Sequence, residues 1–261
     1  MKLLVKLGGT LLDTEATRES LASQIAAVSR AVSIVVVHGG GRQMTRFLDE
    51  RGIESHFVNG LRVTTPAILD AVVAVVAGSV NCQLVAALNR EGARAVGLSG
   101  IDACLVEAEQ MDDSLGSVGR VVTAHPDLLH LLLGGGFLPV VACVAGDRDG
   151  RLYNVNADQM AVTCATAFGA DLLVFLTDVE GVLDAGKRLV PYLTLAASES
   201  LIAEGAATGG MLAKLNAAHA SLRQGVPQVR IAGGASSRIL ERILAGEEVG
   251  TRIAAAEVCT K

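Results

Sequence analysis

The chain has 261 residues, of which 51% are hydrophobic and 19% are charged, which is enough apolar sequence for a large core and excludes a disordered protein. Only 3% of the residues are aromatic and Trp is absent, so the core must consist mainly of Ala, Val, Leu and Ile. The net charge of −5 argues against a nucleic-acid partner, because such binding needs a broad surface of Lys and Arg to neutralise phosphates.

The first half of the chain alternates short β-rich runs with helical patterns, which is typical of βα units around a mainly parallel sheet. In the clearest helix, Thr65 is the expected N-cap and Pro66 the first helical residue. The segment Cys104–Thr123 is expected to form hairpins. The predicted strands are Leu3–Leu7, Ser33–Val37 and Ala95–Leu98, and the predicted helices are Glu15–Arg30, Gln43–Arg51 and Pro66–Glu91.

The second half continues this alternation without a linker rich in Pro, Gly or Ser. The predicted strands are Leu138–Ala142, Leu172–Leu176 and Val229–Ala232, with a turn at Gly146–Gly150, and the predicted helices are Asp127–Leu133, Ala157–Phe168, Met211–Gln224 and Arg238–Leu244. We therefore expect one domain over residues 1–261, a three-layer α/β/α sandwich around a mainly parallel central sheet. Its N-terminal lobe would cover about residues 1–150 and its C-terminal lobe about residues 151–261.

Targeting and metal-binding patterns are missing from the sequence. The N-terminal run Leu3–Leu7 is too short for a signal peptide, and no segment approaches the ~18 apolar residues of a spanning helix. We therefore expect a cytoplasmic protein without a membrane partner. None of the five cysteines forms a C-x-x-C pair or a zinc pattern, so reduced thiols and no metal site are expected; they are Cys82, Cys104, Cys143, Cys164 and Cys259.

Glycine-rich turns follow two predicted strands. Glycines at the carboxyl end of a strand, as in Lys6-Leu7-Gly8-Gly9, let the backbone approach an anion, and Lys6 adds a positive charge. In His38-Gly39-Gly40-Gly41 the loop leads into a helix, where N–H groups attract anions. Neither a Rossmann fingerprint, an esterase serine elbow nor a Walker A motif is present, so a cradle for a phosphate or a substrate remains. We expect His38 itself to be structural.

Lysine is rare among the 22 basic residues, since only five are Lys and the rest are Arg. Lys6 and Lys214 are the two lysines inside glycine-flanked core elements, where a compact ammonium suits a phosphoryl group in motion. Lys214 follows Thr208-Gly209-Gly210 at the start of a predicted helix, which favours phosphate binding.

Three further motifs carry polar side chains. Arg62, on a turn before the long helix, has a fork that suits a carboxylate, although a surface arginine in a turn is the plainer interpretation. Asn154 and Asn156 alternate on an extended segment and so face the same way, and Asp158 follows in the first helical turn. Helix capping explains one of these three residues but not all of them. The segment 177–181 follows the apolar strand Leu172–Leu176.

Taken together, these motifs resemble the amino acid kinase family over nearly the whole chain and in family order. The pair NGLRVT and NVNAD separates the chain from aspartokinases, carbamate kinases and uridylate kinases, which share the fold. The matching stretches are KLGG (Lys6–Gly9), VHGGG (Val37–Gly41), NGLRVT (Asn59–Thr64), VGLSGID (Val96–Asp102), LPVV (Leu138–Val141), NVNAD (Asn154–Asp158), TDVEGV (Thr177–Val182) and GGMLAK (Gly209–Lys214).

The resemblance implies an activity and partners. ATP, with Mg²⁺, would phosphorylate the side-chain carboxylate of N-acetyl-L-glutamate in arginine biosynthesis, with the acyl amino acid on the N-terminal lobe and the nucleotide on the C-terminal lobe. Two alternatives stay open: a kinase for another N-acylated or carrier-bound acidic amino acid, and a non-catalytic sensor on the same fold. Sequence alone does not identify the acyl pocket.

The resemblance also assigns roles to residues. Lys6 and Lys214 would stabilise the phosphoryl group, and Asp158 would hold both lysines. Gly8, Gly40 and Gly41 would donate backbone N–H groups. The substrate would bind at Gly40, Gly41, Arg62, Asn154 and Asn156, with Arg62 on the α-carboxylate. The nucleotide would bind at Gly8, Gly9, Thr177, Asp178, Val179, Glu180, Gly181, Val182, Leu183, Ala206, Ala207, Thr208 and Gly209.

The resemblance finally suggests an assembly. Arginine-inhibited members carry an extra N-terminal helix that links dimers into a hexamer, whereas here the first strand begins at Leu3. We therefore expect a homodimer that is insensitive to arginine, with the helix Pro66–Glu91 as the dimer element. No residue indicates a PII-type regulatory partner.

Overall fold

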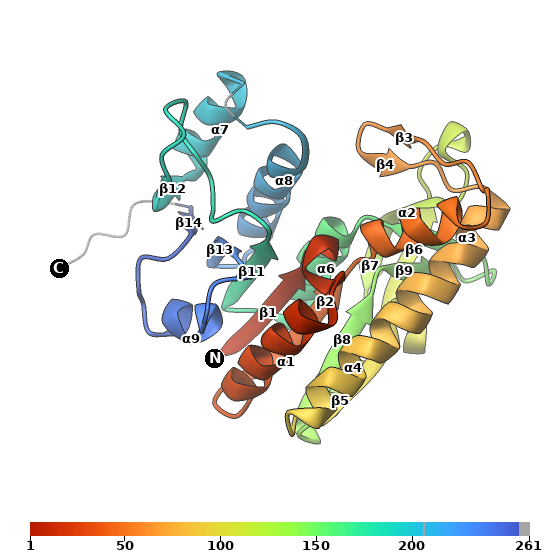
Figure 1. Cartoon of the computed structure of the whole chain (residues 1–261), viewed down its shortest axis with the longest axis horizontal. Coiled ribbons are helices and arrows are strands. Elements are labelled where there is room, and N and C mark those ends of the chain that lie inside the picture. Colours follow the sequence, from red (N-terminus) through yellow and green to blue (C-terminus); the bar gives the residue numbers. More distant parts are fainter. Residues whose placement is uncertain (206, 256–261) are drawn as a thin grey trace.

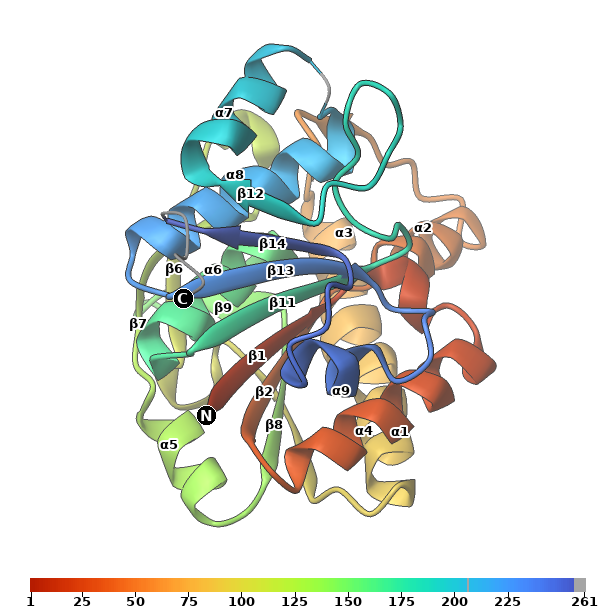
Figure 2. The same cartoon turned by 90° about the vertical axis from the view of Figure 1, so that its left-hand side faces the viewer.

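The computed structural model describes residues 1–205 and 207–255. Its centre is an eight-stranded sheet, which runs between two layers of helices (Figures 1 and 2). From edge to edge the strands are β12 (Tyr192–Thr194), β14 (Thr251–Ala254), β13 (Gln228–Gly233), β11 (Leu172–Thr177), β1 (Lys2–Leu7), β2 (Ser33–His38), β8 (Leu138–Ala142) and β5 (Ala95–Ser99).

The sheet is mainly parallel, as the sequence predicts. The six strands from β13 to β5 run in one direction, and β14 is antiparallel to β13. Two smaller sheets accompany it: a four-stranded one of β10 (Leu152–Val155), β7 (Val118–Ala124), β6 (Val106–Gln110) and β9 (Val144–Gly146), and a hairpin of β3 (Phe57–Val58) and β4 (Leu61–Arg62).

Helices cover both faces of the central sheet, which confirms the three-layer sandwich. Figure 2 shows α5 (Asp127–Gly134), α6 (Ala157–Phe168) and α8 (Gly209–Arg223) on one side, and α1 (Glu15–Ser29), α4 (Asn81–Arg90) and α9 (Ile239–Leu244) on the other. The other helical segments are α2 (Gly41–Asp49), α3 (Pro66–Val72), α7 (Leu195–Ala203) and the short turns η1 (Gly9–Leu12), η3 (Asp102–Cys104) and η4 (Asp113–Leu115).

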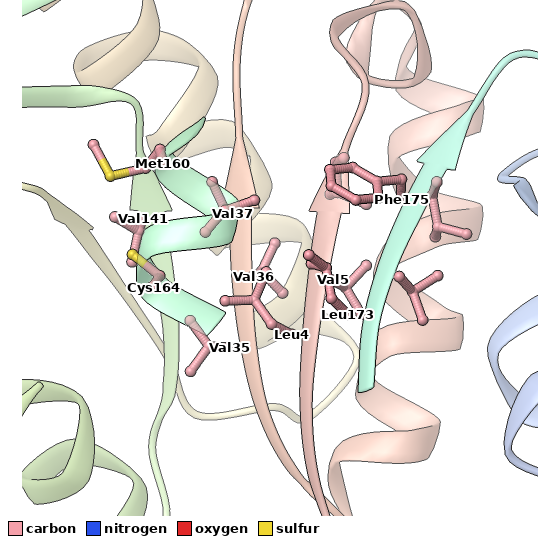
Figure 3. Close-up of a cluster of buried hydrophobic side chains, with 14 of the residues drawn as sticks. Leu4, Val5, Val35, Val36, Val37, Val141, Met160, Cys164, Leu173 and Phe175 are labelled. Atoms are coloured by element: carbon pink, nitrogen blue, oxygen red, sulfur yellow. The ribbon is translucent and has the colours of Figure 1, made fainter. Parts of the chain in front are cut away.

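The packing of α6 on the sheet forms the centre of the core. Met160 and Cys164 lie one turn apart on α6, and Figure 3 shows them beside Val35, Val37 and Val141. All five side chains are almost completely buried. Strands buried on both faces read as continuous apolar runs, which is why the main strands were predictable from the sequence.

The long helix predicted over Pro66–Glu91 is continuous but not uniform. The Thr65 side chain caps it by accepting the N–H of Ile68, and Pro66 is its first residue, both as predicted. Between α3 and α4 the segment η2 (Val73–Val80) is π-helical, which sequence patterns did not foresee. Helices of this type are rare and are frequently found at functional sites.

The same helix is apolar enough and long enough to cross a membrane, with a mean hydropathy of 2.0 over its best window, which the sequence analysis did not anticipate. It packs against α1, α2 and β5, and 44% of that window is buried inside the protein. Among the described cysteines, Cys82 and Cys104 are exposed free thiols and Cys143 and Cys164 are buried ones; Cys259 lies outside the described residues.

Candidate active site

A buried ion pair lies at the carboxyl end of β1. Lys6 Nζ is 2.6 Å from Asp158 Oδ1, and the two side chains are only 8% and 10% exposed. The pair forms because Lys6 points to the face of the sheet that α6 covers, and Asp158 is the second residue of α6. Strand β1 lies between β2 and β11, so the chain order reverses at this point, where ligands of open α/β sheets bind.

Lys214 approaches the same carboxylate from α8, which packs against α6. Burial lowers the pKa of Lys214, the charge of Asp158 opposes this effect, and the charge of Lys6 adds to it. Its Nζ donates a hydrogen bond of 3.2 Å to the carbonyl of Gly210 and makes no ion pair within the described part of the chain. The three charged groups thus share one electrostatic neighbourhood, with Lys214 close to Asp158 but not in contact with it.

Two glycine turns meet beside this ion pair. A Cβ atom on Gly9 would lie 2.9 Å from the backbone nitrogen of Gly41, so the two loops touch only because Gly9 has no side chain. Gly40 is the N-cap residue of α2 and Gly41 its first residue, and the first N–H groups of a helix have no partner inside it. Gly8 differs from the expectation: its N–H donates to the carbonyl of Leu176 at 2.9 Å, so sheet pairing uses this donor.

Arg62 is buried next to the second glycine turn. Its guanidinium donates to Thr45 Oγ1 at 2.8 Å and to the carbonyl of Gly41 at 3.3 Å, and it stacks on the ring of Phe57. Burial lowers the pKa of Arg62, although the guanidinium stays charged at neutral pH. In residues 1–205 and 207–255 no carboxylate forms an ion pair with it. The charge of Asp49 offsets part of the cost of burying this cation, but no carboxylate touches the guanidinium, so Arg62 is prepared for an anionic ligand.

A hollow of about 170 Å³ lies beside Arg62 and the second glycine turn. The polar part of its wall contains the loop 39–41, Arg62, Asn154 and Asn156. The apolar part is formed by Met44, Val72, Val76 and Val118. Charge at one end and aliphatic side chains along the wall suit a small molecule with a carboxylate and a short apolar group.

The two asparagines in this wall have different hydrogen bonds. Asn154 Nδ2 donates to Thr64 Oγ1 at 3.0 Å, and that hydroxyl donates to the carbonyl of Arg62, so the amide is held by the segment that directly follows β4. Asn156 is the N-cap of α6, where its Oδ1 accepts the N–H groups of Asp158 and Gln159. The capping alternative is therefore correct for Asn156, whose amide nitrogen is what remains for a ligand.

The segment after β11 follows the strand that pairs with β1 on the side opposite to β2, which leads into the loop 39–41 of the hollow. Thr177 Oγ1 donates to Asp178 Oδ1, and the charge of Asp178 reaches Lys214. Val182 differs from the expectation: its side chain is 1% exposed, its N–H donates to Thr251 Oγ1, and its carbonyl accepts from Val190. Val182 therefore anchors the loop, because packing and hydrogen bonding leave no group of it for a nucleotide.

The rest of this segment and the start of α8 remain open to a ligand. Val179 and Leu183 are 43% and 42% exposed. Thr208 is the N-cap residue of α8, and Gly209 begins the helix with a φ of +52°, a conformation that favours glycine. Ala207 is buried, and Ala206 lies outside the described residues.

Comparison with known proteins identifies the group to which this arrangement belongs. The sequence model described as the amino acid kinase family matches residues 1–233. The chain belongs to the amino acid kinase family. A protein named acetylglutamate kinase from Solibacter usitatus (strain Ellin6076) is 66% identical over 257 residues, which are 98% of this chain and 100% of that protein. Another of that name, from Geobacillus kaustophilus (strain HTA426), is 43% identical over 88% of this chain and 89% of its own.

A solved structure of an N-acetylglutamate synthase from Neisseria gonorrhoeae, complexed with coenzyme A and N-acetyl-glutamate, matches with a TM-score of 0.88 and 25% identity. The match covers 98% of this chain and 60% of the synthase. The fold therefore occurs as one part of a longer protein, as in the synthase, and as nearly the whole of a shorter one, as in the Solibacter relative. As a member of the amino acid kinase family, the present chain is a kinase, with the central sheet and flanking helices of its relatives.

In this amino acid kinase, sequence patterns found the charged residues but missed the groups that hold them. The sequence did not point to three supporting residues. They are Phe57, which stacks on Arg62, Thr64, which bonds Asn154, and Asn81, which bonds His38. Thr64 belongs to the NGLRVT stretch, which was a usable signal. Asn81 also had one, since it is a buried amide on the apolar face of a long helix. No local pattern points to Phe57, because its contact with Arg62 depends on the β3–β4 hairpin.

Proposed function

We propose that the protein transfers the γ-phosphoryl group of ATP to the side-chain carboxylate of N-acetyl-L-glutamate, giving N-acetylglutamyl 5-phosphate for arginine biosynthesis. The observation that carries the proposal is the position of Asp158, which lies 2.6 Å from Lys6 and within electrostatic reach of Lys214 beside two glycine turns. The names of the relatives that are 66% and 43% identical support the same substrate.

The chemistry requires few groups from the protein. The attacking carboxylate is ionised at neutral pH, so no general base is needed. Catalysis then consists of alignment and of charge stabilisation at the phosphoryl oxygens. Lys6 and Lys214 would supply that stabilisation from two elements, with Asp158 holding Lys6 by direct contact and Lys214 through its charge.

The acyl amino acid would occupy the hollow of about 170 Å³. Arg62 would bind its α-carboxylate, and the N–H groups of Gly40 and Gly41 would bind anionic oxygens at the start of α2. Asn154 would address the amide through its Oδ1, because its Nδ2 already donates to Thr64. Asn156 would contribute its amide nitrogen.

ATP would lie over the C-terminal lobe, along the turn at Gly8–Gly9, the segments Thr177–Gly181 and 206–209, and Leu183. The Mg²⁺ that accompanies ATP neutralises phosphate charge, and the phosphate oxygens themselves would hold it. Asp178, whose charge reaches Lys214, would be a protein carboxylate near this site. The two lobes would meet near residue 150 of the sequence. Strand β10 and helix α6 follow this residue but pack against β7, β9 and β1, which precede it.

We also infer a cytoplasmic homodimer. The sheet ends at β5, and a groove of about 310 Å³ separates this edge strand from the partly exposed flank of η2 and α4. Ala77, Val85 and Leu98 give the groove an apolar lining. A second copy of the chain would cover this flank and the unpaired edge, which natural proteins rarely leave open.

Trapping of the acyl phosphate with hydroxylamine tests the activity directly. We expect the hydroxamate to form with ATP, Mg²⁺ and N-acetyl-L-glutamate, and to form more slowly with N-succinyl-L-glutamate, N-acetyl-L-aspartate or free L-glutamate. A faster reaction with another acyl amino acid would show that this compound, and not N-acetyl-L-glutamate, is the substrate. Nucleotide or amino-acid binding without any product would favour the non-catalytic sensor, although a sensor has no need of both lysines.

A further inference from the structure

His38 is a buried titratable residue that the proposed chemistry does not use. It is the last residue of β2, is 0% exposed, and opens the glycine turn. Its Nδ1 lies 3.0 Å from the carbonyl of Gly39, and its Nε2 lies 2.9 Å from Asn81 Nδ2. Both ring nitrogens therefore have protein partners, and neither faces a ligand.

The partners of Asn81 determine which ring nitrogen carries the proton. Asn81 Nδ2 also lies 3.0 Å from the carbonyl of Val140, which can only accept a hydrogen bond, so this atom must be the amide nitrogen. It therefore donates to His38 Nε2, which must be unprotonated. The proton is then on Nδ1 and is donated to the carbonyl of Gly39. Burial lowers the pKa of His38 to about 4, so the ring is neutral at pH 7.

This hydrogen bond fixes the direction of the next peptide group. A trans peptide is planar, and its N–H points opposite to its carbonyl. Since the carbonyl of Gly39 is held toward the imidazole, the N–H of Gly40 points away from it, and no acceptor for this N–H occurs among the described residues. The loop 39–41 lines the hollow on the side away from the buried ring.

The surroundings hold this arrangement firmly. A Cβ on Gly39 would lie 3.3 Å from Ala157 of α6, and one on Gly40 would lie 3.2 Å from Val76 of η2. Asn81 begins α4 directly after the π-helical segment, and a Cβ on Gly97 would lie 2.1 Å from its Oδ1. The Asn81 side chain thus fits only because position 97 is glycine.

We propose that His38 is a positioning residue which, held in one tautomer by Asn81, turns the N–H of Gly40 into the hollow, where it binds an oxygen of the reacting carboxylate or of the transferring phosphoryl group. This inference rests on the proposed function for the identity of those oxygens. The inference extends the proposed active site by His38 and Asn81, which would act on the reaction through the backbone and without touching the substrate.

Two substitutions separate positioning from packing. In His38→Asn the amide nitrogen takes about the place of Nδ1 and still donates to Gly39, whereas His38→Gln reaches toward Asn81 but has no donor at Nδ1. We expect His38→Gln to lose about tenfold or more in kcat for acyl-phosphate formation. His38→Asn should stay within a few-fold of the wild type, and both should keep the KM for ATP. Equal losses in the two variants, or a greater loss in His38→Asn, would overturn the proposal.

The wild-type protein provides a second measurement that does not depend on variants or on the substrate. In ¹⁵N-histidine-labelled protein at pH 7, His38 should appear as a neutral ring protonated at Nδ1, whose signals do not change between pH 6 and pH 8. A ring protonated at Nε2, or at both nitrogens, would refute the tautomer. If wild-type protein makes no acyl phosphate from N-acetyl-L-glutamate, the proposed function fails, while the spectrum still tests the positioning.

Discussion

Lys6 and Lys214 are the residues on which the phosphoryl transfer depends most. Lys6 is held by a buried carboxylate, whereas Lys214 is held only by its own helix and by more distant charge. Removing either ammonium should therefore reduce kcat by about 10² to 10³, as for other lost preorganised donors. The hydroxamate assay on Lys6→Ala and Lys214→Ala measures this loss.

Lys2→Ala is the matched control for this experiment. Lys2 is exposed at the other end of β1, where it contacts Phe168, so its loss should leave kcat unchanged. If Lys6→Ala were as active as Lys2→Ala, neither the ion pair nor its lysine would take part in the reaction.

His38 should make stability depend on pH. In the unfolded chain a histidine has a pKa near 6.5, whereas burial holds His38 at about 4, so the unfolded state binds more protons below pH 6.5. Stability is then complete above pH 6.5 and is lost as the pH falls toward 4. Between pH 7.5 and pH 5 this loss is about 2 kcal/mol.

Urea denaturation of the wild type and of His38→Asn at several pH values checks this sign and size. Burial also lowers the pKa of His219, and this contribution cancels because both proteins contain that residue. The wild-type free energy of unfolding should fall more steeply toward pH 5 than that of the variant. Parallel curves would mean that His38 is protonated equally in both states.

At the scale of elements, the contact between the two glycine turns brings η1 and α2 together. A methyl group at position 9 would press against the backbone of Gly41 at 2.9 Å, whereas a methyl group at position 41 meets nothing within 4 Å. We expect Gly9→Ala to lower the thermal midpoint by several degrees, as a strained contact of about 1–3 kcal/mol would. Gly41→Ala is the control and should unfold at the wild-type temperature; equal midpoints would contradict this contact.

Elements with continuous apolar runs were predictable, and elements made by distant partners were not. Leu172–Thr177 and Ser33–His38 differ from the predicted strands by one residue, since burial on both faces leaves a clear pattern. The strands β3, β4, β12 and β14 are only two to four residues long and depend on pairing partners elsewhere in the chain. Helix α7 was missed although Thr194 gives it an N-cap.

The site was predictable to a similar extent. Motif order located Lys6, Asp158 and Arg62, because each belongs to a stretch that resembles the family. The hydrogen bonds that use the N–H of Gly8 and both backbone groups of Val182 come from β11 and from the segments near Val190 and Thr251, so no local pattern reveals them. Likewise, the residues next to His38 in the sequence do not reveal its hydrogen bond with Asn81.

At the scale of the whole molecule, the proposed dimer depends on one flank of the long helix. Cys82 faces the groove beside β5, whereas its neighbour Gln83 faces α1, and both are exposed in the single chain. A charge on the first flank should break the dimer, because an unpaired carboxylate would be buried between the copies. We expect Cys82→Glu to have the mass of a monomer in solution and Gln83→Glu that of a dimer. Equal masses for the two variants would place the interface elsewhere.

The central place of β1 also affects how the chain is made. β1 leaves the ribosome before both of its partner strands. β2 can pair with one of its edges soon afterwards, but its other edge belongs to β11 (Figure 1). The residues between Leu7 and Leu172 take about ten to thirty seconds to synthesise. Throughout that time the open edge of a strand with four apolar residues out of six is accessible to neighbouring nascent chains, so production of this protein should depend on chaperones and on translation speed far more than its final compact state suggests.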